Sequence, residues 1–361
     1  METGMRVGLS AHIEGGTAGG APRSERRWLS ILIPVYNVEP YLRDCLASLL
    51  PQLPPEGVEV ILLDDASTDG SLGLCSEICP QSHPQVRLMR HASNAGLSAA
   101  RNTMLDAARG DYIWFIDSDD EVMPGSIARL RAIIDRYGPD LVLCDYARGG
   151  RHLSSFAGPS GRPSDDRETL LQGVFAQRRL HSWSKIARRS LWGDDLRFPA
   201  GRCFEDIATT PWLLLRARTH YHAAEAWVRY RDRPDSIMGS LRRSRGRFDD
   251  CRNDDLAMSL AGFDAATREA LPAMSDVTRR HIAHFWAKEF TKICWRLLSS
   301  SAFHVPWRDL RRKLARYRGM MDAESPIAFA TLARLYRSRG HLPRAVVLSA
   351  CLWLAQADDA R

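Results

Sequence analysis

The stretch Asp111-Tyr-Ile-Trp-Phe-Ile-Asp-Ser-Asp-Asp-Glu121 decides how the rest of the chain is interpreted. Its apolar part, Tyr112 to Ile116, is short and rich in aromatic and β-branched residues, which is typical of a buried strand. Carboxylates are costly inside such a strand, so we expect the acidic residues that follow to lie where the strand leaves the sheet. Asp117 and Asp119 are spaced to share one hard cation through oxygen ligands. On this stretch alone, a solvated acidic turn is the simpler interpretation.

Composition indicates a soluble globular protein with an anionic partner. The chain has 361 residues, 45% of them hydrophobic and 26% charged, and its mean hydropathy is −0.29. This length suits two domains, or one large domain with an appendage. A net charge of +7 favours nucleotides, phospholipid surfaces or acidic polymers as partners. Because only four of the 50 basic residues are lysine, much of this arginine excess can also reflect genomic base composition.

The cysteine pattern and the absence of long apolar runs favour a cytoplasmic location. The eight cysteines include no Cys-x-x-Cys pair and form no even framework, which is typical of a reducing compartment. No stretch approaches the roughly 18 to 20 apolar residues of a membrane span. The glycine-rich start lacks the apolar core of a signal peptide, so we expect residues 1–28 to form a disordered leader.

Strands and helices alternate over the first half of the chain. This alternation predicts an α/β fold, with a Rossmann-like, mostly parallel sheet flanked by helices. In such sheets, ligands gather at the carboxyl ends of the strands. Three predicted strands end in polar clusters, which favours one shared site over three unrelated turns. The clusters are Tyr36-Asn37, Asp64-Asp65 and Asp117 with Asp119.

Four sequence blocks together resemble the family 2 glycosyltransferases of the GT-A fold. They are Ser30-Ile-Leu-Ile-Pro-Val-Tyr-Asn37, Leu63-Asp-Asp-Ala-Ser-Thr-Asp-Gly70, Asn94-Ala-Gly-Leu-Ser-Ala-Ala-Arg-Asn102 and Phe115-Ile-Asp-Ser-Asp-Asp120. Each block alone is weak, but their order and spacing make the combination specific. The resemblance implies a nucleotide-sugar donor, a divalent metal ion, Mn²⁺ or Mg²⁺, and inversion at the anomeric carbon.

The resemblance also assigns roles at the strand ends. It places Pro34 and Tyr36 at the nucleotide, with the Tyr36 ring against the base, and lets Asp65 hydrogen-bond that base. Asp117 would address the ribose and the metal, and Asp119 the metal. Asp120 and its neighbour Glu121 are better explained as the solvated exit from the strand, and neither is included among the ligands.

Two further residues are carried over with an alternative beside each. Arg101 would lie near the nucleotide, although an ion pair within the fold is an equally good interpretation of this residue. Leu196 to Asp206 resembles the family's Phe-Pro-x-Gly-x-x-x-Glu-Asp segment, which makes Asp206 the catalytic base that takes the acceptor hydroxyl's proton. Glu205 would be a helper or a structural neighbour. The alternative is an acidic pair that favours the first turn of a helix.

A later segment resembles the family's phosphate-contacting Tyr-Arg-x-Arg-x-x-Ser-Ile pattern. Arg231 or Arg233 would pair with diphosphate oxygens, and Ser236 would donate a hydrogen bond to them. The Gln-x-x-Arg-Trp motif of processive synthases is absent, so addition of a single sugar is favoured over polymerisation.

The last third of the chain is predicted to be helical and is not covered by the resemblance. We expect a catalytic domain at residues 29–239 and a helical C-terminal domain at 240–361. In the helix predicted from Trp307 to Arg318, the apolar residues fall on one face and arginine covers the rest. That face would either pack on its own domain, the commoner case, or dock on an anionic membrane. Ala345 to Ala357 is too short to span a bilayer and would pack, contact a membrane or dimerise.

The function predicted from the sequence is therefore an inverting, metal-dependent glycosyltransferase. We expect a nucleotide-sugar donor, most simply a UDP-sugar, and a saccharide acceptor in surface polysaccharide or lipid-linked glycan synthesis. The expected location is cytoplasmic, with peripheral contact at the inner face of an anionic membrane, and no nucleic-acid partner is expected. Two alternatives stay open: transfer to polyprenyl phosphate or to a protein, and a catalytically silent GT-A domain used for binding or scaffolding.

Overall fold

The structure is a computed structural model that describes residues 27–78, 83–233, 250–301 and 306–356. The expected leader lies outside the described residues except for its last two positions. The expected domain boundary at residues 239 and 240 and the predicted phosphate contact Ser236 also lie outside them.

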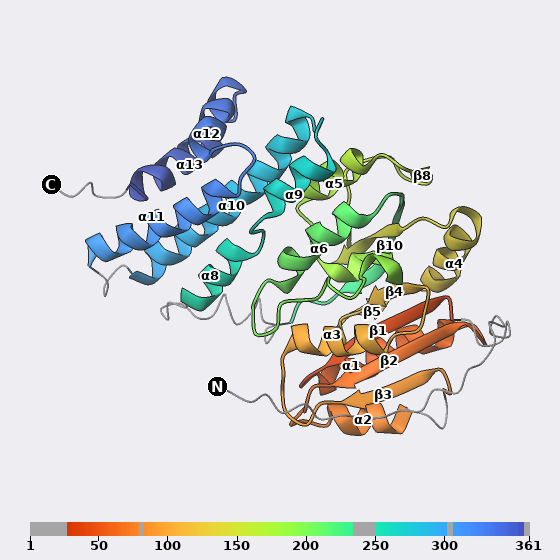
Figure 1. Cartoon of the computed structure of the whole chain (residues 1–361). Helices are drawn as coiled ribbons and strands as arrows, with labels where there is room; N and C mark the ends of the chain where they lie inside the picture. Colours follow the sequence, from red (N-terminus) through yellow and green to blue (C-terminus); the bar gives the residue numbers. More distant parts are fainter. Residues whose placement is uncertain (1–26, 79–82, 234–249, 302–305, 357–361) are drawn as a thin grey trace, which may run out of the picture.

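One mixed sheet forms the first part of the molecule (Figure 1). Its strands follow the order β3-β2-β1-β4-β9-β6-β10-β5, with β7 beside β6 and β8 beside β10. The strands are β1 (Leu29–Val35), β2 (Val58–Asp64), β3 (Val86–Arg90), β4 (Tyr112–Phe115), β5 (Glu121–Val122), β6 (Leu141–Arg148), β7 (Arg151–Leu153), β8 (Pro163–Ser164), β9 (Lys185–Arg188) and β10 (His220–Tyr230).

Parallel pairing dominates where the site is expected. Strand β1 pairs in parallel with β2 and β4, β2 with β3, and β6 with β10. Only β9, inserted between β4 and β6, and the short strands β5, β7 and β8 run antiparallel to their neighbours. The predicted mostly parallel α/β sheet is confirmed.

Helices cover both faces of the sheet and continue beyond it. They are α1 (Glu39–Leu49), α2 (Ser71–Ile78), α3 (Leu97–Ala107), α4 (Ser126–Tyr137), α5 (Arg167–Gln177), α6 (Glu205–Arg216), α8 (Asp250–Met258), α9 (Phe263–Ala270), α10 (Asp276–Ser301), α11 (Trp307–Ala323), α12 (Phe329–Ser338) and α13 (Leu342–Leu354). Short 3-10 turns occupy Leu50–Gln52, Ser182–Ser184 and Arg189–Leu191.

Every residue of β1 and β2 is buried, as their unbroken apolar runs predict. Successive strand residues point to opposite faces, so one face of the sheet packs against α1, α2 and α4 while the other packs against α3, α5 and α6. The apolar core on the face covered by α3, α5 and α6 continues without interruption into α9 to α13. The C-terminal helices are therefore held by the same buried apolar cluster that supports the sheet.

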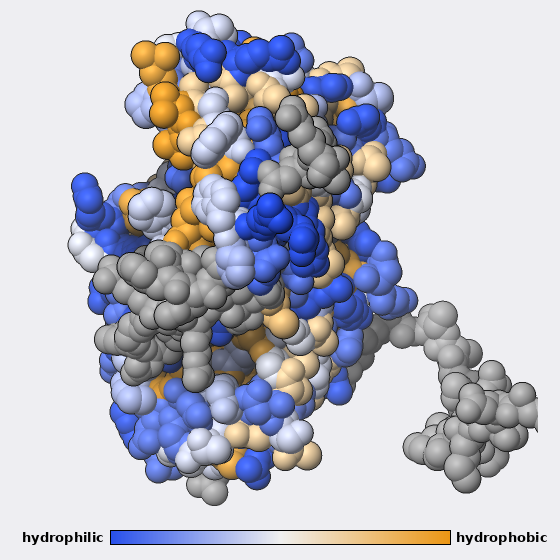
Figure 2. Space-filling model, turned by 90° about the vertical axis from the view of Figure 1, so that its left-hand side faces the viewer, coloured by the Kyte–Doolittle hydropathy of each residue, from blue (hydrophilic) through white to orange (hydrophobic). Residues whose placement is uncertain are grey.

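The C-terminal region is helical, as predicted, and Figure 2 looks onto the side of the molecule where these helices lie. Leu310 and Leu314, on the apolar face of α11, are buried, so this helix packs within the protein. Trp307, at its start, stays half-exposed. Within the described ranges, no helix combines the length and the apolar character needed to cross a bilayer.

Candidate active site

The polar ends of β1, β2 and β4 meet at one edge of the sheet. The register sets Val35 beside Asp64, and the Asp65 amide donates a hydrogen bond to the Val35 carbonyl at 2.8 Å. On the other side of β1, the Ile116 amide donates to the Leu32 carbonyl at 3.0 Å. Tyr36, Asp65 and Asp117 therefore leave the sheet from three adjacent strands.

Unusual backbone conformations accompany these exits. Non-glycine residues rarely adopt positive φ, which costs roughly 1–2 kcal/mol each. Among the described residues only four do so, and three of them adjoin predicted site residues: Asn37 follows Tyr36, Ala66 follows Asp65, and Phe204 precedes Glu205. Such outliers persist where the surrounding structure requires them, and they gather at functional sites.

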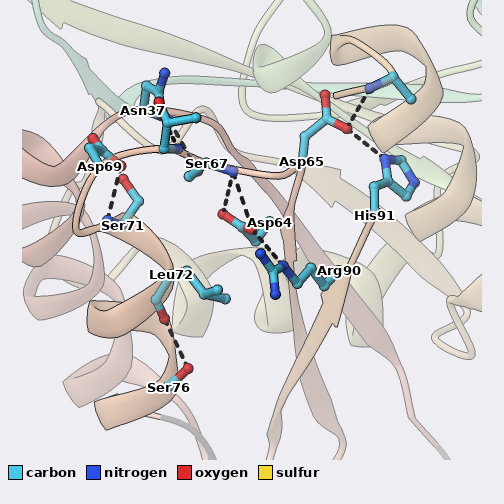
Figure 3. A network of polar contacts seen from close by, with 12 residues as sticks. Asn37, Asp64, Asp65, Ser67, Asp69, Ser71, Leu72, Ser76, Arg90 and His91 are labelled. Atoms are coloured by element: carbon cyan, nitrogen blue, oxygen red, sulfur yellow. Dashed lines mark hydrogen bonds and ion pairs between the residues drawn. The ribbon is translucent and has the colours of Figure 1, made fainter. Parts of the chain in front are cut away.

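Asp65 has hydrogen-bond partners within the protein itself (Figure 3). Its carboxylate accepts from the backbone amides of Ala95 at 2.9 Å and Gly96 at 2.8 Å, and it lies 2.6 Å from Nδ1 of His91. Asp65 is buried, and these bonds join the end of β2 to the start of α3. Asp65 therefore ties three segments together at this edge of the sheet, and its predicted bond to a nucleotide base stays a prediction.

The two β1 residues predicted to contact the nucleotide differ in exposure. Pro34 is buried in the strand, whereas Tyr36 is 45% exposed at its end. The ring of Tyr36 is therefore accessible to a flat partner, as stacking on a base requires.

Arg101 joins the catalytic and metal-binding candidates. Its guanidinium donates to Asp117 at 3.0 Å, to Glu205 at 2.9 Å and to Asp206 at 3.0 Å, and only 1% of its side chain is exposed. Burial alone would lower the pKa of Arg101, but Asp206, Asp117 and Glu205 together raise it above its usual range. In the structure, Arg101 forms ion pairs within the fold, as the alternative interpretation expects, and these ion pairs lie within the predicted site.

A two-way clamp places the segment that carries Asp206. The side-chain amide of Asn102, on α3, donates to the Phe198 carbonyl at 2.8 Å and accepts from the Phe198 amide at 2.9 Å. The Phe198 ring in turn lies 5.2 Å from the Arg101 guanidinium. These contacts direct the chain toward Phe204 and the first turn of α6, where Asp206 lies.

Asp117, Asp119 and Asp120 form an acidic cluster in which one oxygen from each lies within 4.8 Å of the others. The expectation that Asp120 is solvated is wrong, because Asp120 is only 1% exposed. Its Oδ1 accepts from the Arg231 amide at 2.8 Å, and its buried Oδ2 has no hydrogen-bond partner among the described residues. Three clustered carboxylates with an unpartnered buried oxygen suit a hard divalent cation, so the residues present fit the Mn²⁺ or Mg²⁺ that the resemblance implies.

The cluster carries more negative charge than its surroundings neutralise. Burial, followed by repulsion from Asp117 and Asp119, raises the pKa of Asp120 to about 9. Burial also raises the pKa of Asp117 to about 6, with Arg101 opposing the shift and Asp119 adding to it. Burial and the neighbouring Asp206 raise the pKa of Glu205 to about 7. Excess carboxylate charge of this kind favours a bound cation.

Arg231 and Arg233 take different positions at this edge. Arg233 lies 2.6 Å from Asp119, whereas Arg231 pairs with Asp44 at 2.9 Å and with Glu121 at 2.8 Å. Both guanidinium groups also lie over the ring of Tyr41, at 5.4 and 5.5 Å. Arg233 is therefore the arginine of the two that reaches the acidic cluster.

Sequence reasoning missed Tyr41 and the position of Asp120. Tyr41 fits the apolar pattern of α1, which gives no sign of its contact with the two distant arginines. The run of aspartates in the sequence was a signal for Asp120, but the direction of its side chain depends on contacts with the distant Arg231.

Comparisons with known proteins agree with this geometry. The family model described as glycosyl transferase family 2 matches residues 30–190. "Glycosyltransferase GlyA" of Streptococcus pneumoniae is 28% identical over 58% of this chain and 31% of its own length. "Poly(ribitol-phosphate) beta-glucosyltransferase" of Bacillus spizizenii is 42% identical over 28% of this chain and 16% of its own length. The chain thus spans less than a third of either relative.

A solved structure shares the fold over nearly the whole chain. S. aureus TarS 1–349 in complex with UDP-GlcNAc has a TM-score of 0.68 and 21% identity, and the match covers 90% of this chain and 91% of that one. The likeness includes the helical C-terminal region, because the matched share extends well beyond the sheet. The blocks at the strand ends, the family match over 30–190 and this shared GT-A fold lead to one conclusion. Residues 30–190 of the chain form a glycosyl transferase family 2 domain.

Proposed function

We propose that this chain transfers a sugar, with inversion, from a UDP-sugar to a hydroxyl group of a saccharide acceptor. The observation that carries the proposal is the position of Arg101. This one buried guanidinium holds both Asp117, from the nucleotide and metal edge, and Asp206, the candidate base. The two halves of a transfer site are therefore joined by one side chain.

The donor side follows from the strand ends. Tyr36 offers an exposed ring for the base, and Arg233 supplies a cation beside Asp119 for the diphosphate. A divalent ion held by Asp117 and Asp119, with Asp120 beside them, would neutralise charge on the departing diphosphate. UDP is the expected nucleotide because the TarS neighbour was solved with UDP-GlcNAc.

The acceptor side is assigned to α6. Asp206 accepts the proton of the attacking hydroxyl while the oxygen forms the new glycosidic bond, and the nucleoside diphosphate leaves from the opposite face of the sugar. Arg101 orients Asp206 through its 3.0 Å contact with the carboxylate. The transition state has oxocarbenium character, as in glycoside hydrolysis.

We assign the acceptor to surface polysaccharide or lipid-linked glycan synthesis. The name of the poly(ribitol-phosphate) glucosyltransferase relative supports a bacterial surface polymer as the acceptor class. The proposed location is cytoplasmic, with peripheral contact at the inner face of the membrane. The catalytic unit is proposed to span residues 29–239, with the helical unit following at 240–361.

A panel of nucleotide-sugars, assayed for release of nucleoside diphosphate with Mn²⁺ and then with EDTA, tests the proposal. We expect release from a UDP-sugar that EDTA abolishes. Asp119→Asn should lower release by about 10²–10³-fold, as expected when a group that stabilises transition-state charge is lost. Asp135→Asn, an exposed control on α4, should leave it unchanged. No release from any donor, with nucleotide binding retained, would identify a silent binding domain instead.

A further inference from the structure

A basic pocket lies in the C-terminal region, where α5, α10, α12 and α13 come together. Its volume of about 370 Å³ is near the lower end for ligand sites in proteins and suits a small group rather than an oligosaccharide. None of the described residues that line it is an aspartate or a glutamate. Four of them are arginines: Arg178, Arg280, Arg339 and Arg344.

The four guanidinium groups have no counter-ion among the residues that the structure describes. Within the described part of the chain, none of them takes part in a side-chain hydrogen bond or an ion pair, although most other arginines near the sheet do. Glu289 is the carboxylate that acts on Arg178 from outside the lining, and it is already paired with Lys292 at 2.6 Å. Arginine without a carboxylate partner is suited to phosphate, which it binds in a bidentate manner.

The end of α5 brings Arg178 to the pocket. Arg178 ends the helix in the left-handed conformation, with φ of +56°, and its amide donates to the Val174 carbonyl at 2.8 Å. This hydrogen bond fixes the backbone from which Arg178 lines the pocket.

The positive charge of the pocket arginines also acts on the pKa of two histidines that line it, His281 and His284. His284 lies 2.5 Å from the Tyr336 hydroxyl on the facing helix α12. Burial lowers the pKa of His284 to about 4, and Arg344 and Arg178 contribute to the shift. Burial and Arg280 also lower the pKa of His281. The arginines thus supply the charge of the pocket, while these two histidines stay neutral at pH 7.

An apolar stripe begins next to the pocket and runs along α13. Leu342, which follows the pocket residue His341, is 56% exposed, Val346 is 67% exposed and Trp353 is 64% exposed. Spacings of four and seven residues place all three on one helix face, opposite the buried face that packs on the core. No charged residue interrupts Ala345 to Ala357. Figure 2 shows hydrophobic residues gathered in the upper part of this side of the molecule.

We propose that this region is a docking site for anionic phospholipid. The pocket binds the lipid phosphate, and the stripe on α13 lies in the apolar boundary of the bilayer. The chemistry of the partner follows from the juxtaposition, because an anionic phospholipid joins a phosphate group to an apolar body. The inference deepens the proposed function by naming the surface for its membrane contact, but it requires no sugar transfer.

Vesicle flotation with the full chain tests the site. We compare vesicles of phosphatidylcholine alone with vesicles that also contain phosphatidylglycerol. A basic residue near an anionic surface strengthens binding roughly fivefold, so Arg339→Gln combined with Arg344→Gln should weaken it by roughly 30-fold. The matched control, Arg334→Gln with Arg337→Gln, removes the same charge from exposed positions of α12 outside the pocket lining and should retain most of the binding.

A second pair of variants tests the stripe without changing charge. Leu342→Ser with Val346→Ser should weaken vesicle binding by roughly tenfold for each side chain that enters the bilayer. Trp307→Ser, a half-exposed aromatic on α11, is the control and should bind as the wild type does. Circular dichroism of each variant shows that the fold is intact.

Several results would overturn the proposal. They are the absence of flotation with either vesicle, equal losses in the pocket pair and its control, and retained binding in the stripe pair. Stabilisation by inorganic pyrophosphate without vesicle binding would assign the pocket to a soluble phosphate. A dimer in analytical ultracentrifugation that Val346→Ser dissolves would assign the stripe to a second copy. UDP release from a soluble donor is measured in parallel, so that failure of the proposed function is seen separately.

Discussion

Replacement of Arg101 by methionine should strongly destabilise the protein. The variant leaves Asp117, Glu205 and Asp206 without the guanidinium that now contacts all three. Removing one partner of a buried ion pair costs about 3–5 kcal/mol, because the remaining charge is left uncompensated. Methionine keeps an apolar stem beside Phe115, so most of the loss is electrostatic. We expect the free energy of unfolding to fall by about 3–5 kcal/mol in urea titrations followed by tryptophan fluorescence with EDTA present.

A double-mutant cycle with Glu205→Gln isolates the electrostatic part. Without Arg101, the Glu205 carboxylate loses its cationic partner and keeps the repulsion of Asp206 and Asp117. The change that Glu205→Gln causes in the free energy of unfolding should therefore be more stabilising in the Arg101→Met background than in the wild type, by about 1–3 kcal/mol. The titration is run at pH 8, above the Glu205 pKa of about 7. A loss below about 1 kcal/mol for Arg101→Met, or a coupling energy near zero, would refute the role given to Arg101.

Three further predictions concern other parts of the fold and the site. Gly110→Ala should lower the free energy of unfolding by about 1–3 kcal/mol, because its Cβ would clash with the backbone nitrogen of Ser30. Gly73→Ala, in open space on α2, should raise the free energy of unfolding by about 0.5–1 kcal/mol. Thermal melts that fail to separate the two variants would contradict this. Asn102→Ala should lower the free energy of unfolding by about 1–3 kcal/mol. It should also slow sugar transfer more than it weakens UDP binding, because it releases the segment that carries the base. Equal losses in the transfer rate and in the UDP affinity measured by calorimetry would argue against the clamp. The raised pKa of Glu205 makes the folded state bind more protons than the unfolded state between about pH 4.5 and 7. Ionisation of this residue therefore lowers the free energy of unfolding as pH rises through that window. Glu205→Gln should make the urea midpoint depend less on pH there.

Sequence patterns predicted the sheet well because each of its central strands is buried on both faces. The apolar runs at β1, β2 and β4 have few other structural solutions, and the helices between them show clear periodicity. Strand β9, with only four residues that include a buried lysine, gave no such signal. Its place between β4 and β6 depends on antiparallel pairing with distant segments, which local pattern does not specify.

The loop from Gly149 to Asp166 shows the same limit. It contains the short strands β7 and β8, and its start is held by Asp145. That carboxylate lies 2.8 Å from His152 and 2.9 Å from His222, and accepts from the Ser155 amide at 2.8 Å. Each partner is unremarkable in the sequence, and only tertiary structure brings them together.

At the candidate site, the sequence named residues that the structure brings close together, but it did not give their pairing. The sequence blocks named Asp117, Asp119 and Asp206, but they did not show that Arg101 contacts both Asp117 and Asp206, the latter 105 positions away. The exposure of Asp120 was mispredicted because burial beneath the Arg231 segment is a long-range effect. The choice between Arg231 and Arg233 depended on where the chain turns after β10, and the structure sets Arg233 beside Asp119.

The most direct test of the account is the effect of Asp206→Asn on sugar transfer, measured together with UDP binding. If Asp206 is the base, transfer from the active UDP-sugar should fall by about 10²–10⁴-fold. UDP affinity with Mn²⁺ should stay within about twofold, because Asp206 contacts Arg101 rather than the proposed nucleotide residues Tyr36 and Asp65. Transfer at the wild-type rate by Asp206→Asn would contradict the proposed mechanism.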